Sequence, residues 1–226
     1  SSCIVSEAGS FEISGNFFKS NENDILLNNV SAGIESHIDR NEFYGNNIGY
    51  NARGTTFGIN RIYENSFHTN YVDAFNDGNN NFNILNNEFY GPLGAVSINN
   101  GSGNGIINMN KFSDNFIGIL TFGSNSNLNF IQNCFNTTFK DAYIDGSVSP
   151  SISNGVNPAN NCFTHHGISS SSIQELGGNP IPFKYVEPND NFSDCRDAIL
   201  AHPNVIREFT GHNFPYSTCG ILSFEG

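Results

Sequence analysis

The stretch Ile38-Asp39-Arg40-Asn41-Glu42-Phe43-Tyr44-Gly45 contains the pattern that decides the fold. Its core, Ile-x-x-Asn-x-Phe, recurs along most of the sequence. Successive Asn-x-Phe motifs are 25, 24, 22, 23, 23 and 28 residues apart, and their asparagines are Asn16, Asn41, Asn65, Asn87, Asn110, Asn133 and Asn161. A fixed period in this range is the signature of a stacked repeat protein, in which each unit buries its apolar face against its neighbours.

Two kinds of solenoid fit a repeat of this length. Leucine-rich repeats also carry an apolar-x-x-Asn-x-apolar segment. However, the chain contains only nine leucines, and the segments between the motifs lack ten residues with helical periodicity. These segments contain Asn, Gly, Ser and short alternating apolar pairs such as Val96-x-Ile98 and Ile117-x-Ile119, which are typical of strands and turns. We therefore expect each repeat to be one coil of three short strands.

This pattern resembles the right-handed parallel β-helix repeat family, and the resemblance covers roughly residues 8–163. It implies an all-β fold, a right-handed parallel β-helix solenoid of about seven coils, one for each motif. Because side chains alternate along a strand, the Ile and Phe of a motif can both point inward, with the Asn at the bend between them. The expected core is a hydrogen-bonded ladder of these asparagines beside stacked Phe18, Phe43, Phe67, Phe89, Phe112 and Phe135.

The regular repeat ends near residue 163, which predicts coils at 1–163 and a small C-terminal capping or linking region at 164–226. Residues 194–203 form the one segment with helical character, with Ser193 or Asp194 as its N-cap and Pro203 at its end. An uncovered end of a β-helix is an unpaired strand edge that promotes association. A region that covers this end would limit such association.

The five cysteines bear on the cellular location. Cys195 and Cys219 lie in a region too small to build its own core, so we predict that they form a disulfide. Cys134 and Cys162 occupy the same place in consecutive motifs and are the second candidate pair, which leaves Cys3 over. Paired cysteines imply an extracellular or cell-surface location, whereas five unpaired thiols would indicate a cytosolic protein.

The charge balance limits the partners. The formal net charge is −12 and the nine basic residues are scattered, so nucleic acid and anionic membrane surfaces are poor partners. No run of eighteen apolar residues occurs, and we expect no membrane span.

One group of charged residues from two adjacent repeats is the candidate catalytic cluster: Asp39, Arg40, Glu42, Arg61, Glu64 and His68. Corresponding positions of stacked coils lie side by side, so these side chains can share one outer face. A solvated face with weak ion pairs is the alternative interpretation. The Asn-Thr-Asp, paired-Asp, Gly-His-Gly and Arg-Ile-Lys motifs of polygalacturonases are all missing.

Two further sites are candidates for ligand binding. Asp73 and Asp77 lie in an oxygen-rich turn that can bind Ca²⁺, although their spacing matches neither an EF-hand nor a nonapeptide β-roll, and no other cofactor is expected.

The residue after each motif Phe points outward, which places Tyr44, His68 and Tyr90 on three successive coils. Exposed rings in a row can stack on sugars or dock on a partner, and ordinary surface tyrosines are the alternative.

Together with the resemblance, these features predict a structural or adhesive module of a secreted or cell-surface bacterial β-helix protein, acting by assembly or attachment. Its partners would be copies of itself, further coils of a longer polypeptide, or a surface polysaccharide. A polysaccharide-binding or polysaccharide-processing β-helix, such as a lyase or glycoside hydrolase, is the alternative. Since Phe11-x-Ile13 is already an in-register strand, we also expect earlier coils or another copy to cover it, with self-association of the isolated chain.

Overall fold

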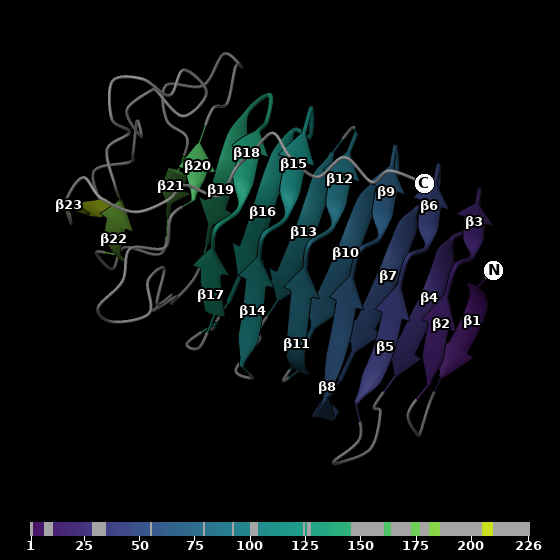
Figure 1. Cartoon of the computed structure of the whole chain (residues 1–226). Helices are drawn as coiled ribbons and strands as arrows, with labels where there is room; N and C mark the ends of the chain where they lie inside the picture. Colours follow the sequence, from purple (N-terminus) through teal and green to yellow (C-terminus); the bar gives the residue numbers. More distant parts are fainter. Residues whose placement is uncertain are drawn as a thin grey trace.

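The chain forms a parallel β-solenoid (Figure 1). The computed structural model describes residues 2–6, 11–28, 35–54, 56–78, 80–91, 93–99, 104–123, 125, 128–145, 161–163, 173–176, 181–185 and 205–209. Within these residues the structure is all-β, with 23 strands and no helix. The described part therefore contains no helix of the length and apolar character that crossing a membrane requires.

Three parallel sheets run along the solenoid. Sheet A consists of β1 (Ser2–Ser6), β4 (Asn23–Asn28), β7 (Ile48–Arg53), β10 (Val72–Asp77), β13 (Gly94–Asn99), β16 (Ile117–Phe122), β19 (Lys140–Ile144) and β21 (Ile173–Glu175). Sheet B consists of β2 (Glu12–Ser14), β5 (Ser36–Asp39), β8 (Thr56–Tyr63), β11 (Asn80–Leu85), β14 (Gly105–Asn108) and β17 (Leu128–Ile131).

Sheet C is built from the motif strands themselves, which are at most three residues long. Its members are β3 (Phe17–Lys19), β6 (Glu42–Tyr44), β9 (Ser66–His68), β12 (Glu88–Tyr90), β15 (Lys111–Ser113), β18 (Cys134–Asn136) and β20 (Cys162–Phe163). A separate parallel pair is formed by β22 (Ile181–Tyr185) and β23 (Val205–Phe209).

The predicted fold class is confirmed, but the number of coils is slightly lower than seven. Six groups of three strands, from β2–β4 to β17–β19, pass through sheets B, C and A in turn, so five full turns separate the first and last strands of sheet B. The seventh motif contributes β20, and β21 then extends sheet A, whereas residues 146–160 are outside the described part. The predicted helix at 194–203 also falls outside the described residues.

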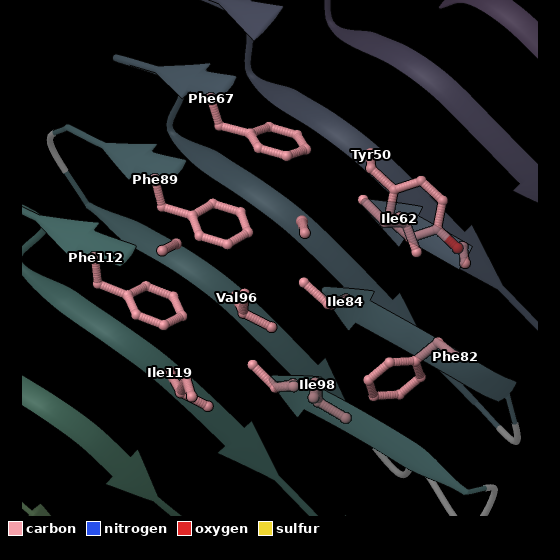
Figure 2. Close-up of a cluster of buried hydrophobic side chains, with 14 of the residues drawn as sticks. Tyr50, Ile62, Phe67, Phe82, Ile84, Phe89, Val96, Ile98, Phe112 and Ile119 are labelled. Carbon is pink, nitrogen blue, oxygen red and sulfur yellow. The ribbon is translucent and has the colours of Figure 1, made fainter. Parts of the chain in front are cut away.

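The predicted phenylalanine stack fills the interior beneath sheet C. Neighbouring rings from Phe18 to Phe135 have centroids 4.5–5.1 Å apart and interplanar angles of 3–16°. Figure 2 shows the stacking of Phe67, Phe89 and Phe112 beside the isoleucines of sheet B. Beneath sheet C the core is thus one column of phenylalanines, as expected when equivalent residues of successive coils pair in register.

The predicted asparagine ladder is also confirmed, and Asn65 shows how each rung works. Its Oδ1 accepts hydrogen bonds from the backbone N–H and the Nδ2 of Asn41, at 3.0 and 3.1 Å. Its Nδ2 donates to Oδ1 of Asn87 at 3.0 Å and to the carbonyl of Ile38 at 2.9 Å. The same links connect the motif asparagines from Asn16 to Asn161. The buried amides are therefore satisfied by one another and by backbone of adjacent coils.

The residue before each ladder asparagine from Asn16 to Asn133 has left-handed backbone. Besides Gly15, these residues are Arg40 (φ 53°), Glu64 (φ 55°), Asn86 (φ 55°), Met109 (φ 56°) and Gln132 (φ 54°). Such a conformation is uncommon for side chains other than Gly, Asn and Asp. Each of these turns still continues the backbone ladder; for example, the N–H of Arg40 donates to the carbonyl of Tyr63 at 3.3 Å. Hydrogen bonds between coils thus stabilise a left-handed conformation that these residue types do not favour by themselves.

A second, shorter asparagine ladder lies at the turn from sheet C to sheet A, and the sequence analysis missed it. Asn46 Nδ2 donates to Oδ1 of Asn70 at 2.9 Å, and the backbone N–H of Asn21 donates to Oδ1 of Asn46 at 2.9 Å. This ladder stands beside two buried carboxyl groups: Asn21 donates to Asp24 at 2.7 Å and Asn70 to Asp73 at 2.8 Å. The available signal was an asparagine five residues after the motif asparagine.

Candidate functional site: the outer face of sheet C

The outer face of sheet C carries two columns of side chains. In each three-residue strand the middle Phe is buried, so the first and third residues face outward. The third residues form a column in which Lys19, Tyr44, His68, Tyr90, Ser113 and Asn136 pair in register. The outward alternation therefore brings together the three rings that the sequence singled out.

Tyr44, His68 and Tyr90 form the ring column of this face. The ring of His68 is 6.4 Å from that of Tyr44 and 6.3 Å from that of Tyr90, centroid to centroid, with interplanar angles of 37° and 48°. Tyr44 and Tyr90 keep 44% and 45% of their surface exposed. The Nζ of Lys19 lies 5.6 Å from the centroid of the Tyr44 ring, within the range of a cation–π contact. The column is an exposed, tilted row of π faces.

Acidic side chains stand next to the ring column. Glu42 and Glu88 are the first residues of the strands that carry Tyr44 and Tyr90, and they pair in register with Ser66 on the strand between them. Glu88 lies 3.7 Å from the Nζ of Lys111 on the next strand. Glu42 and Glu88 each stand two residues before a ring residue on the same strand, a spacing that predicts the same face and was the signal available in the sequence. The face therefore combines ring surfaces with hydrogen-bond acceptors.

The candidate catalytic residues do not form one cluster. Asp39 is fully buried at the end of β5, where its Oδ2 accepts hydrogen bonds from Ser14 at 2.9 Å and from Nε of Arg40 at 2.7 Å. The hydrogen bond and charge of Asp39 raise the pKa of Arg40. Glu64 stands one coil along from Arg40 in the left-handed turns, whereas Glu42 and His68 lie on sheet C. Asp39, Arg40 and Glu64 thus lie at the end of sheet B and in the turns that follow it, whereas Glu42 and His68 lie on sheet C.

Arg61 binds a residue that the sequence analysis did not consider. Its Nε and a terminal nitrogen donate to the two carboxylate oxygens of Glu35, at 3.0 and 2.9 Å. Nε2 of His37 lies 3.4 Å from the same carboxylate. The hydrogen bond from Arg61 is the main cause that lowers the pKa of Glu35. A bidentate pair of this kind is a stable surface contact and leaves the guanidinium already occupied.

The two candidate calcium ligands have separate partners. Asp73 is buried, accepts the hydrogen bond from Asn70, and has a pKa raised well above its ordinary value by burial. Asp77, at the end of the same strand, accepts a hydrogen bond from Nδ2 of Asn99 at 3.0 Å. Within the described residues, no three or more His, Cys, Asp and Glu side chains gather as metal ligands would. Calcium binding stays a prediction that these contacts do not support.

The described cysteines differ in their state. Cys134 is disulfide-bonded, and Cys162 is its register partner on the neighbouring strand. The spacing of about 4.8 Å between adjacent strands lies within the range that a disulfide spans, so Cys162 stays the predicted partner. Cys3 is an exposed free thiol, and Cys195 and Cys219 fall outside the described residues.

Comparison of the chain with protein-family models, with curated proteins and with solved structures found no match.

Proposed function

We propose that this chain is a structural module of a secreted or cell-surface protein, of the kind found among bacterial right-handed parallel β-helix repeats, and that it acts by attachment or assembly. The observation that carries the proposal is the ladder from Asn16 to Asn161, which bonds every described coil to the next. Such a ladder supports a stiff rod whose lateral faces are available to partners. The disulfide at Cys134 supports an oxidising location.

The outer charged residues support attachment rather than catalysis. Asp39 and Arg61 are engaged in ion pairs with Arg40 and Glu35, at 2.7 and 2.9 Å. General acid–base catalysis needs a titratable group that can approach a substrate proton. The buried, paired Asp39 does not offer this, and the exposed Glu42 has Ser66 as its neighbour in register.

The structural proposal is tested by asking whether the chain cleaves polysaccharides. The purified chain is incubated with neutral, acidic and amino-sugar polysaccharides, and chain scission is followed by new reducing ends and by unsaturated products. We expect no scission by any fraction that contains the folded chain. Scission that co-purifies with the protein and is lost in a Glu42→Gln or Arg61→Met variant would overturn the proposal in favour of an enzyme.

A second function is favoured by the ring column. Tyr44, His68 and Tyr90 present three adjacent π faces, and the flanking Glu42 and Glu88 can accept hydrogen bonds from hydroxyl or ammonium groups. Together with the net charge of −12, this arrangement suits neutral or cationic polysaccharides better than polyuronates. The attachment proposed for this module would then take place at the outer face of sheet C.

Affinity measurements on single variants test the ring column. Tyr44→Ala and Tyr90→Ala should each weaken polysaccharide binding by about tenfold, which corresponds to about 1.4 kcal/mol. Tyr71→Ala is the matched control, because Tyr71 is 58% exposed but lies at the turn before β10 rather than in the column. Equal losses in all three variants, or none, would contradict a binding site on the ring column.

A further inference from the structure

Four polar side chains point into the core of the second and third coils, where the neighbouring coils are largely apolar. They are Ser36, Tyr50, Asn60 and Asn76, which we call the interior polar cluster. Each is between 0% and 2% exposed. Unlike the ladder asparagines, they lie on the walls formed by sheets A and B rather than at a turn.

The cluster contains five buried atoms without a hydrogen-bond partner among the described residues. These are Oγ of Ser36, the hydroxyl of Tyr50, Nδ2 of Asn60, and both Nδ2 and Oδ1 of Asn76. A buried polar atom left unpaired costs about 1–3 kcal/mol, and such atoms are rare in native proteins unless ordered water pairs with them. Oδ1 of Asp39 is also without a partner among the described residues, but it lies at the end of β5, whereas the five atoms of the cluster lie on the walls and call for a common partner.

The register places the four residues in two pairs, one on each wall, with the members of a pair on adjacent strands. Ser36 pairs with Asn60 on adjacent strands of sheet B. On sheet A, Tyr50 lies on β7, and Asn76 lies on the adjacent β10 beside Ala52. Since the end of β7 leads directly into β8, which carries Asn60, the two walls meet at this corner. Figure 2 shows the Tyr50 side chain projecting into the core, with its hydroxyl oxygen at the tip.

Small residues accompany the cluster. Ala52 lies beside Asn76, and Ala74 is the register partner of Tyr50. In other coils the same columns are filled by Leu27, Val96 and Ile98. Apart from the ring of Tyr50, the inward positions beside the unpaired polar atoms are therefore occupied by smaller side chains than in those coils.

We propose that Ser36, Tyr50, Asn60 and Asn76 form an internal binding site for ordered water. One water molecule makes at most about four hydrogen bonds, so five atoms indicate two or more molecules. The two amide nitrogens can only donate and would face away from a metal cation, whereas water accepts from them and donates to Oδ1 of Asn76. This site is independent of the outer face of sheet C.

Thr121 provides a matched contrast within the same chain. Its Oγ1 is also buried without a partner among the described residues. Its register partners in the inward column are Ile98 and Ile144, so no second polar group of that column adjoins it. A water needs several polar partners to be retained, and the hydroxyl of Thr121 is therefore expected to stay dry.

The test combines water counting with thermal unfolding. Oxygen-17 magnetic relaxation dispersion on the folded chain should count at least two fewer long-lived internal waters in Asn76→Leu than in wild type, with no change in Thr121→Val. Tyr50→Phe removes one hydroxyl without changing the ring. If water pairs with that hydroxyl, Tyr50→Phe lowers Tm by about 2–4 °C, whereas Thr121→Val leaves it equal or higher.

The opposite results overturn the proposal. A rise in Tm in Tyr50→Phe like that in Thr121→Val would mean that both hydroxyls are unpaired and dry. An unchanged water count in Asn76→Leu would mean that any internal water lies elsewhere. If Asn76→Leu does not fold, the sign of the Tm shift in Tyr50→Phe decides the question alone.

Discussion

The two asparagine ladders use the same side chain at two turns of each coil, yet they differ in length and in partners. The ladder at the turn from sheet B to sheet C links every motif asparagine, and each Nδ2 donates to the next asparagine and to a core carbonyl. The ladder at the turn from sheet C to sheet A links Asn21, Asn46 and Asn70, and there Nδ2 of Asn70 donates instead to the buried Asp73.

A buried asparagine at the second turn does not by itself extend the second ladder. In the fourth repeat the position of the second ladder is occupied by Pro92, which offers no side-chain amide. The coil beyond it uses Asn115, whose Nδ2 donates to the carbonyl of Gly91 at 2.8 Å. The turn from sheet C to sheet A thus tolerates residues other than asparagine, whereas the turn from sheet B to sheet C has asparagine in every repeat.

Phe89→Ala should cause the largest loss of stability, about 3–5 kcal/mol. The ring is 1% exposed and stacks between Phe67 and Phe112, so its removal leaves a cavity in the middle of the stack. Urea unfolding measures the loss. Phe17→Ala is the control, because Phe17 is 61% exposed and should change stability by less than about 0.5 kcal/mol.

Asn65→Ala should cost about 3 kcal/mol, more than Asn70→Ala in the same coil. Removing Asn65 leaves two buried N–H donors of Asn41 and the carbonyl of Ile38 without their partner. Asn70→Ala also leaves the two N–H donors of Asn46 without their acceptor. However, the carbonyl of Phe43 loses only a 3.2 Å bond, and Asp73, whose pKa burial raises, loses one donor to a carboxyl group that burial favours in its neutral form. If urea unfolding gives the same loss of unfolding free energy for both variants, the two ladders contribute equally to stability and the prediction is wrong.

The second ladder should make stability depend on pH. Burial raises the pKa of Asp24 to about 6, against about 3.9 for an unfolded aspartate. Between these values the folded state binds more protons than the unfolded state, so stability falls as pH rises from about 4 to about 6, by roughly 2–3 kcal/mol from this group.

Asp24→Asn tests that dependence. The variant keeps an acceptor for Asn21 and removes the carboxyl proton, so its stability relative to wild type should be greater at about pH 7 than at about pH 4. Unfolding curves at several pH values give the difference between the two proteins. A difference that is flat with pH would show that Asp24 titrates normally. Asn41→Ala should shift stability equally at all these pH values.

The surface ion pair should contribute least. Glu35 and Arg61 form a bidentate contact, but their side chains are 45% and 35% exposed. A double-mutant cycle with Glu35→Gln and Arg61→Met should give a coupling energy below about 1 kcal/mol, which decreases further in high salt. A coupling as large as that of a ladder asparagine would place this pair among the structural contacts of the solenoid.

Local periodicity was enough to predict most of the fold. The in-and-out alternation around Asn41 correctly places Phe43 inside and Tyr44 outside, and the repeat carries this assignment to His68 and Tyr90. The candidate catalytic set could not be predicted in the same way. Its members lie at positions of the coil that are not equivalent. Arg61 binds Glu35, and Glu35 is not part of the repeated motif.

The sequence by itself determined the coil, because the period sets which residues stack and the alternation sets which of them face the core. Tertiary structure decided what those stacked positions do. Arg40 and Met109 adopt left-handed turns since their N–H groups donate hydrogen bonds to carbonyls of the next coil. Tyr50 and Asn76 have no hydrogen-bonding side chain beside them, since their register partners on these adjacent strands are Ala74, Ala52 and Ile98. These outcomes depend on contacts between residues more than twenty positions apart in the chain, which no local pattern encodes.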